Sequence, residues 1–90
     1  MTDTTTRTVS HRGASIQLTP REYQLFQALL EHPGQLMTAR QLVLRAWRDT
    51  TLADEELRTY LTSLRRKLRQ IELGRVVNRR GRGYTLVFGT

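Results

Sequence analysis

Apolar residues at alternating positions near the N-terminus predict a short β-hairpin over residues 8–18. Ile16 and Leu18 alternate with polar neighbours after Gly13, a residue that suits a tight turn between two strands. Residues 1–7 are polar and rich in threonine, without the period of a helix or a strand. We therefore expect a flexible tail ahead of the first hairpin.

Two capping sequences predict where two helices begin. Thr19 precedes Pro20 and Glu22, and Thr38 precedes Gln41, so that each threonine can accept from the third helical N–H while the Glu or Gln side chain reaches back. Behind each cap, apolar residues recur every three to four positions, the period of an amphipathic helix. The inward positions are Tyr23, Phe26, Leu29 and Leu30 in the first helix and Leu42, Val43, Ala46 and Trp47 in the second.

A leucine stripe predicts a third helix over about residues 55–71. Its inward positions, taken at the helical angle of about 100° per residue, are Leu57, Leu61, Leu64 and Leu68. The opposite side carries Thr59, Thr62, Ser63, Arg66 and Gln70, and one shoulder carries Arg58, Arg65 and Arg69. Asp54 is a candidate N-cap of this helix, and Gly74 is a candidate terminator.

The last predicted element is a second β-hairpin over about residues 75–88, turning at Gly81-Arg82-Gly83. Its inward positions are Tyr84, Leu86 and Phe88, and its tip gathers Arg79, Arg80 and Arg82. The order of hairpin, three helices and hairpin predicts an α+β fold, with one domain over residues 8–90.

The composition limits the chain to one small domain without cysteine chemistry. Ninety residues allow a single modest core. The absence of cysteine excludes disulfides, thiolate metal sites and a cysteine nucleophile. No apolar run reaches the roughly 18 residues that cross a bilayer, and residues 1–6 lack the pattern of a secretion signal. We therefore expect a cytoplasmic protein with no membrane partner.

The positive charge is concentrated at one end of the sequence. The net charge is +7. Residues 1–56 hold six arginines against seven acids, a balance of −1, whereas residues 57–90 hold nine cations against Glu72 alone, a balance of +8. Such segregation favours a domain that docks one face on phosphates. The alternative is a basic surface that serves solubility and has no partner.

The residue types of the third helix suit the major groove of DNA. Short hydroxyl side chains between arginines allow a helix to approach closely, and Arg can reach guanine O6 and N7. The arginine-rich tip of the second hairpin suits the minor groove, whose negative potential attracts Arg, or the phosphate backbone. The alternatives are an ordinary helix with a solvated basic face and a turn whose arginines are simply exposed.

No arrangement of residues indicates catalysis, a metal or a cofactor. His11 and His32 are separated by a predicted helix, and no acidic cluster has the spacing of a metal site. Ser10, Ser15 and Ser63 have no base at motif spacing. We therefore predict that the chain is not an enzyme and binds neither a metal nor a cofactor.

Five segments carry a pattern that extends from Leu18 to Leu86. They are Leu18-Thr19-Pro20-x-Glu22-Tyr23, His32-Pro33-Gly34, Leu42 with Trp47, Leu64-Arg65-Arg66-Lys67-Leu68, and Arg80-Gly81-x-Gly83-Tyr84. In this order and spacing they resemble the winged-helix effector domain of OmpR/PhoB-type response regulators. The resemblance implies a winged helix-turn-helix fold that binds specific double-stranded DNA and regulates transcription. Residues 55–71 would lie in the major groove, and residues 75–88 would form the wing on the minor groove or backbone.

The resemblance also implies roles for single residues. Bases or phosphates would be contacted by Thr59, Thr62, Ser63 and Arg66, the backbone by Arg65 and Asn78, and the minor groove by Arg80. Their charge and place add Arg58, Arg69, Arg79 and Arg82 as candidate DNA contacts. The connection over residues 48–54 would contact RNA polymerase. Copies that are monomers in solution would bind head to tail on direct repeats.

Several positions depart from the family pattern. The family usually opens its recognition helix with an Asp-Arg pair, where this chain has Asp54 and Glu55, and Glu56 replaces the usual Thr. Arg48 replaces the glycine that normally follows the tryptophan. A carboxylate at the start of this helix would repel phosphate and could instead accept a hydrogen bond from cytosine N4. No receiver domain is present, so the chain is either free-standing or part of a longer regulator.

Two other classes of function compete with DNA binding. The acidic first turn of the third helix favours a winged-helix adaptor that binds RNA polymerase or another protein. Recognition of structured RNA ranks last, because Tyr23, Phe26, Trp47 and Phe88 occupy core-periodic positions and leave no aromatic platform for stacked bases.

Overall fold

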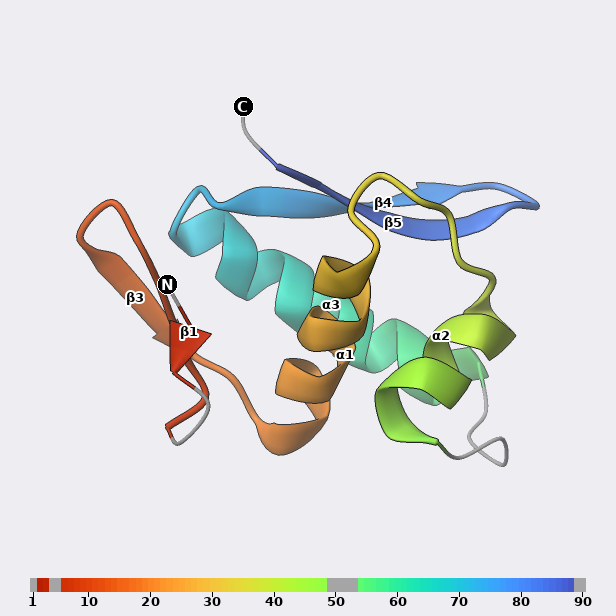
Figure 1. Cartoon of the computed structure of the whole chain (residues 1–90), viewed down its shortest axis with the longest axis horizontal. Helices are drawn as coiled ribbons and strands as arrows, with labels where there is room; N and C mark the ends of the chain where they lie inside the picture. Colours follow the sequence, from red (N-terminus) through yellow and green to blue (C-terminus); the bar gives the residue numbers. More distant parts are fainter. Residues whose placement is uncertain (1, 4–5, 49–53, 89–90) are drawn as a thin grey trace.

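The described part of the chain forms an antiparallel sheet, three helices and a second antiparallel sheet, in the predicted order along the sequence (Figure 1). The computed structural model describes residues 2–3, 6–48 and 54–88. The N-terminal sheet consists of β1 (Thr2–Asp3), β2 (Thr8–His11) and β3 (Ala14–Gln17). The helices are α1 (Pro20–Glu31), α2 (Ala39–Trp47) and α3 (Asp54–Gln70). A C-terminal hairpin of β4 (Gly74–Arg79) and β5 (Gly83–Phe88), called the wing below, completes the fold.

The N-terminal sheet contains one more strand than the sequence predicts. β2 and β3 pair around Arg12 and Gly13, whose positive φ angles of 51° and 80° suit a tight hairpin turn. β1 pairs antiparallel with β2, in register Thr2 to Val9, although residues 1–7 were expected to be a tail. Only this pairing with β2 makes a strand of so short a polar segment, and no periodicity in the sequence reveals it.

Both predicted capping boxes are confirmed. The Thr19 hydroxyl accepts from the Glu22 amide at 3.3 Å, and a Glu22 carboxylate oxygen accepts from the Thr19 amide at 2.9 Å. The corresponding distances between Thr38 and Gln41 are 3.1 and 3.0 Å. These bonds satisfy amides that have no partner inside the helix, which is why α1 and α2 begin where the sequence predicts.

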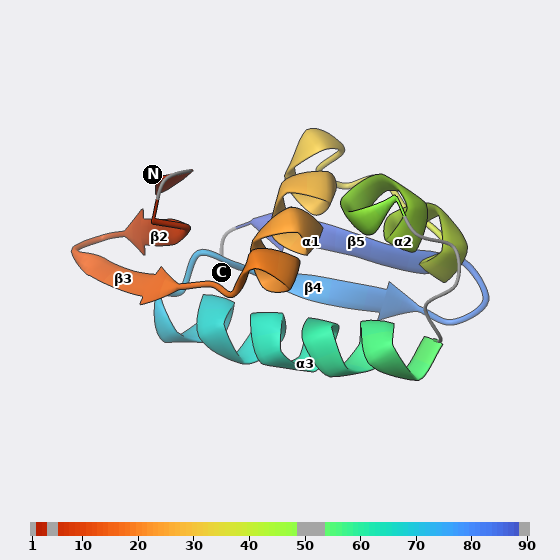
Figure 2. The ribbon, with the colours of Figure 1, turned by 90° about the horizontal axis from the view of Figure 1, so that it is seen from below.

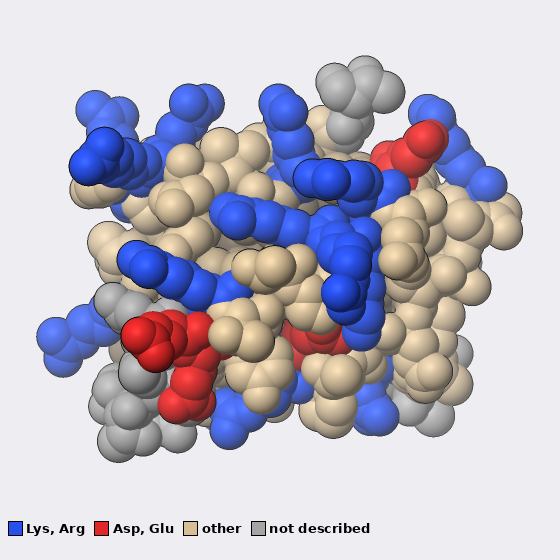
Figure 3. Space-filling view, turned by 180° about the vertical axis from the view of Figure 1, so that it is seen from behind, with Lys and Arg blue, Asp and Glu red and all other residues tan. Residues whose placement is uncertain are grey.

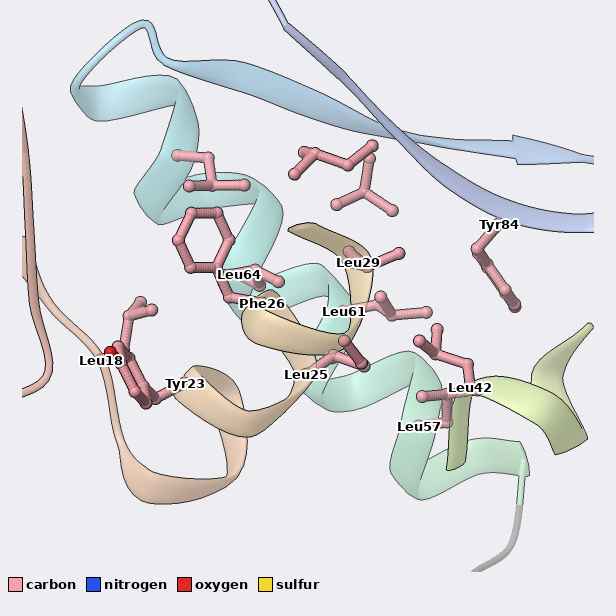
Figure 4. Packing of buried hydrophobic residues seen from close by; sticks show 14 of the residues in the cluster. Leu18, Tyr23, Leu25, Phe26, Leu29, Leu42, Leu57, Leu61, Leu64 and Tyr84 are labelled. Carbon is pink, nitrogen blue, oxygen red and sulfur yellow. The ribbon is translucent and has the colours of Figure 1, made fainter. Parts of the chain in front are cut away.

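The core lies where the apolar faces of the three helices meet the wing (Figure 4). The four leucines of the predicted stripe on α3 are at most 1% exposed. One expectation was wrong: Phe88 is 45% exposed, whereas Leu30 and Ala46 are half-buried and pack against the core. Phe88 follows the alternation of β5, but it pairs with Gly74 at the open end of the hairpin, beyond the region that the helices cover.

The end of α3 differs from the predicted glycine stop. The helix ends at Gln70, and Glu72 adopts the left-handed conformation, with φ of 54°. The Leu73 amide then donates back to the Leu68 carbonyl at 3.4 Å. Gly74 instead begins β4, where a Cβ atom would lie 2.5 Å from the carbonyl oxygen of Val87. The glycine is therefore required for the close approach of the two wing strands and does not cap the helix.

Near the wing tip, β5 is fastened to the segment between α1 and α2. Met37 and Tyr84 exchange two backbone hydrogen bonds, of 2.9 and 2.7 Å, and the Gly34 amide donates to Leu86 at 3.2 Å. Met37 thus forms a single bridge on the free edge of β5. Gly83 makes this bridge possible, because its φ is 125° and a Cβ there would lie 2.0 Å from the Met37 carbonyl oxygen.

Candidate nucleic-acid interface

The face of α3 opposite the core is exposed and carries most of the predicted DNA contacts. The exposed residues on this helix include Arg58, Thr59, Thr62, Arg66 and Arg69, whereas Ser63 and Arg65 are half-buried. Because Leu57, Leu61, Leu64 and Leu68 take the inward stripe, the side chains half a turn away must point outward. The predicted outward face is therefore confirmed for Thr59, Thr62 and Arg66, and Arg58 and Arg69 on the predicted shoulder are exposed as well.

The wing exposes its predicted cations at a tight tip. Arg79, Arg80 and Arg82 are all exposed, and the Arg82 amide closes the turn by donating to the Arg79 carbonyl at 2.9 Å. Gly81, with φ of 76°, permits the turn. Asn78 lies on the same strand face as the buried Val76, so its exposed side chain projects on the side of the helices.

The two basic elements lie side by side. α3 packs along β4, and the tip of the wing projects past the first turn of α3 (Figure 2). One open hollow is lined by Arg58 of α3, by Asn78 to Tyr84 of the wing, and by Thr38 and Ala39 at the start of α2. On the face opposite to that of Figure 1, Lys and Arg side chains form a broad band, and Asp and Glu side chains occupy a few separate patches (Figure 3). Cations distant in sequence thus form one surface.

The start of α2 is a part of this hollow that sequence reasoning missed. The capping box predicts that α2 begins at Ala39, but nothing in the sequence places that turn next to the wing. The one sequence signal for this contact was the apolar Met37, whose pairing with Tyr84 brings the start of α2 next to the wing. Backbone amides at a helix N-terminus favour anions, so the start of α2 adds to the positive potential that the arginines give the hollow.

Three of the predicted contact residues are held by hydrogen bonds within the protein. The Arg65 Nε donates to the Val76 carbonyl at 3.1 Å and links α3 to β4. The Thr59 hydroxyl donates to the Glu55 carbonyl at 3.0 Å, one turn earlier in the same helix. The Ser63 hydroxyl donates to the carboxylate of Glu22 on α1. These bonds orient the side chains and use some of their donors inside the fold.

Glu22 is a buried anion that joins α1 to α3. Its residue is 2% exposed, and one carboxylate oxygen accepts from Lys67 Nζ at 2.6 Å. Lys67 also donates to the Gln17 carbonyl at 3.1 Å, so this cation is engaged within the fold, although its side chain stays 22% exposed. Burial by itself raises the pKa of Glu22, but hydrogen bonds from Lys67, Ser63 and Thr19, with the charge of Lys67, outweigh burial and hold the pKa below its usual value.

We expect this anion to make folding stability depend on acidity. Because the pKa of Glu22 is lower in the folded chain than in the unfolded chain, its contribution is complete above the unfolded value of about 4.3 and is lost as pH falls through the lower folded value. Glu22→Gln lacks that contribution, so urea titrations at pH 7 should give the variant a lower free energy of unfolding than the wild type. The difference between the two free energies of unfolding should shrink as the pH is lowered towards 3.

The control for this experiment is Glu31→Gln, which removes the same charge from an exposed position of the same helix. It measures the effect of net charge alone. A gap between wild type and Glu22→Gln that stays constant from pH 7 to pH 3 would contradict the role of the carboxylate.

The first turn of α3 brings negative charge to the end of the basic surface. Glu55 and Glu56 are both exposed there. The predicted polymerase-contacting connection over residues 48–54 lies outside the described residues except for Arg48 and Asp54. Arg48 closes α2 in the left-handed conformation, with φ of 53°, at the position where a glycine is expected.

Within the described ranges, no three His, Cys, Asp or Glu side chains gather as a metal site would require. Among the helices described, none combines the length and the apolar character needed to cross a membrane.

The comparisons with known proteins identify the domain. Residues 13–86 match the family described as "Transcriptional regulatory protein, C terminal". The chain belongs to this family of OmpR/PhoB-type DNA-binding domains. The match spans β3, the three helices and most of the wing, including both basic elements. An OmpR/PhoB-type domain serves transcription regulation and is not an enzyme.

Solved structures agree with this assignment. The C-terminal domain of the nisin resistance regulator NsrR, a lantibiotic response regulator, is 27% identical with a TM-score of 0.81, over 92% of this chain and 87% of that one. The DNA-binding domain of CssR from Bacillus subtilis is 25% identical with a TM-score of 0.79, over 96% and 97%. The Klebsiella pneumoniae RstA DNA-binding domain, solved with the RstA box, has the same fold at 24% identity, with a TM-score of 0.77 over 94% and 87%. The predicted winged-helix fold is thus confirmed.

Proposed function

We propose that this OmpR/PhoB-type domain binds specific double-stranded DNA in the cytoplasm, with α3 in the major groove and the wing on the minor groove or backbone. One observation carries the proposal: the outward face of α3 and the arginine tip of the wing adjoin on one basic surface. A duplex offers a groove wide enough for one helix and a phosphate backbone beside it, so the two elements can bind at once. The RstA DNA-binding domain, which has the same fold, was solved in complex with the RstA box, and this supports DNA as the partner.

The roles of the residues follow from their positions. Arg66 and Thr62 lie at the centre of the exposed face of α3 and would meet base edges. Arg58 and Asn78 line the hollow between helix and wing, where a phosphate group fits their charge and hydrogen-bonding capacity. Arg79, Arg80 and Arg82 would enter the minor groove or clamp the backbone, and Arg69 would contact phosphate at the far end of α3. Three candidates make hydrogen bonds within the fold and would mainly shape the surface that contacts DNA: Arg65, Thr59 and Ser63.

Arg66→Ala tests whether the helix reads bases. We expect the variant to bind a duplex selected from a random library about 1 to 3 kcal/mol more weakly, with a much smaller loss on random duplex, because only a base contact depends on sequence. Fluorescence anisotropy titrations at fixed salt measure both affinities.

Arg12→Gln is the matched control, because it removes one positive charge at the β2–β3 turn, at the opposite end of the molecule from the wing tip (Figure 1). It should change both affinities little. Equal losses on selected and random DNA for Arg66→Ala would contradict base reading.

The same selection also tests the remaining proposals about partners. We propose that the domain is a monomer in solution and occupies direct repeats in tandem. In gel-shift experiments, a duplex with two copies of the selected site should therefore give a second shifted band. Retention of RNA polymerase by a chain that selects no DNA sequence would instead favour the protein-binding adaptor.

A further inference from the structure

We propose that Glu55 is a specificity-determining residue that selects a cytosine in the major groove by accepting a hydrogen bond from its N4 amino group. This inference deepens the proposed function and rests on it. The residues that carry it are those of the outward row of α3.

Glu55 lies in line with the residues placed to read bases. At about 100° per residue, Thr59, Thr62 and Arg66 fall within about 40° of Glu55 around the axis of α3. All four residues are exposed. Glu56, by contrast, points about 100° away, towards the side that holds Lys67. Of the two exposed acids in this turn, Glu55 alone belongs to the row that would face the base edges.

The carboxylate of Glu55 is available to a ligand. Its nearest outward neighbour, Thr59, donates its hydroxyl proton to the Glu55 backbone carbonyl at 3.0 Å and leaves the carboxylate unused. Among the described residues, no hydrogen bond or ion pair is made by this carboxylate, whereas the other anion that touches α3, Glu22, is fully engaged. A carboxylate on a phosphate-binding face weakens binding unless it meets a donor.

The chemistry of the base edges decides which donor that is. Guanine presents two acceptors in the major groove and thymine presents one beside its methyl group, so both repel a carboxylate. Adenine offers its N6 amino group next to the N7 acceptor, which also repels. Cytosine offers the N4 amino group without a neighbouring acceptor. A carboxylate therefore favours cytosine over the other three bases.

The length of α3 limits where this cytosine lies. Glu55 and Arg66 are separated by eleven residues, which corresponds to about 16 Å along a helix at 1.5 Å per residue. With base pairs stacked every 3.4 Å, the cytosine and the guanine read by Arg66 should lie within about five base pairs of one another. Both bases should appear in one half-site.

The experiment compares wild type with Glu55→Gln and Glu56→Gln in selection from a random duplex library. Each substitution removes one exposed charge from the first turn of α3, so both lose the same favourable interaction with the helix dipole. Wild type should select a cytosine that Glu55→Gln replaces with adenine, because glutamine pairs with adenine N6 and N7. In anisotropy titrations, the ratio of affinities for the cytosine and adenine sites should change by about 10-fold or more.

The outcomes separate this inference from the proposed function. Glu56→Gln should bind all duplexes more tightly and keep the wild-type preference. If Glu55→Gln behaves in the same way, the carboxylate only repels phosphate and the inference is wrong, while sequence-specific binding stands. If wild type selects no sequence, the proposed function fails and the inference fails with it. Thermal unfolding curves for all three proteins confirm that each is folded at the titration temperature.

Discussion

Gly83→Ala is expected to destabilise the domain by about 3 kcal/mol or more, because the substitution combines backbone strain with a clash that cannot relax locally. A Cβ atom at this position would lie 2.0 Å from the Met37 carbonyl oxygen and 2.9 Å from the Thr38 amide nitrogen, both of them backbone atoms. The φ of 125° also belongs to a region that alanine rarely adopts. For a chain of this length, such a loss lowers Tm by roughly 12 °C or more.

The matched control is Gly81→Ala, two residues away at the wing tip. Gly81 has a positive φ of 76°, but a Cβ there would meet no atom within 4 Å. It should therefore cost only about 1 kcal/mol, from the conformation alone. Differential scanning calorimetry on the three proteins measures the difference. Similar Tm values for the two variants would contradict the close packing of the start of β5 against Met37 and Thr38.

Replacing Arg79, Arg80 and Arg82 together by alanine is expected to weaken DNA binding about 100-fold at low salt. Each phosphate that the protein neutralises contributes about −0.9 to the slope of log affinity against log salt concentration, so three lost contacts should make the slope shallower by about 2.7. The wild-type slope should be about −4 to −7 if five to eight phosphates are neutralised. Anisotropy titrations at several salt concentrations measure affinity and slope together.

The same three positions changed to lysine distinguish charge from geometry. Lysine keeps the positive charge but lacks the planar guanidinium, so the salt slope should stay at the wild-type value while affinity for the selected site falls. The three side chains are exposed at a turn, so neither triple variant should lower Tm substantially. An alanine triple with the wild-type slope would show that the wing does not contact phosphates.

Some elements of the fold could be predicted because their causes are local. The caps at Thr19 and Thr38 involve residues three apart, so the sequence contains all the atoms needed. The leucines of α3 repeat with the period of a helix, and all are buried. Where the cause is not local, prediction failed: β1 exists only by pairing with β2, and Gly74 serves strand pairing with β5 rather than the end of α3.

The candidate interface shows the same division. Exposure of Arg58, Arg66 and the wing arginines follows from periodicity and from the turn. Periodicity placed Ser63 on the helix surface, yet its hydroxyl reaches Glu22, as does Lys67, because α1 crosses α3 at that level and supplies a buried carboxylate. Helical angle specifies the side of a helix, but it does not specify which other element covers that side.

The sequence by itself determined the order of the elements, the inward stripe of each helix and the concentration of cations in residues 57–90, since these depend on neighbours a few positions apart. The tertiary structure alone decided that the wing adjoins α3 and the start of α2 on one basic surface. The physical reason is that the backbone at Gly83 approaches the backbone at Met37 closely enough to leave no room for a Cβ atom. These two residues are distant in sequence, so no local pattern reveals their contact. Such contacts depend on the packing of the whole chain.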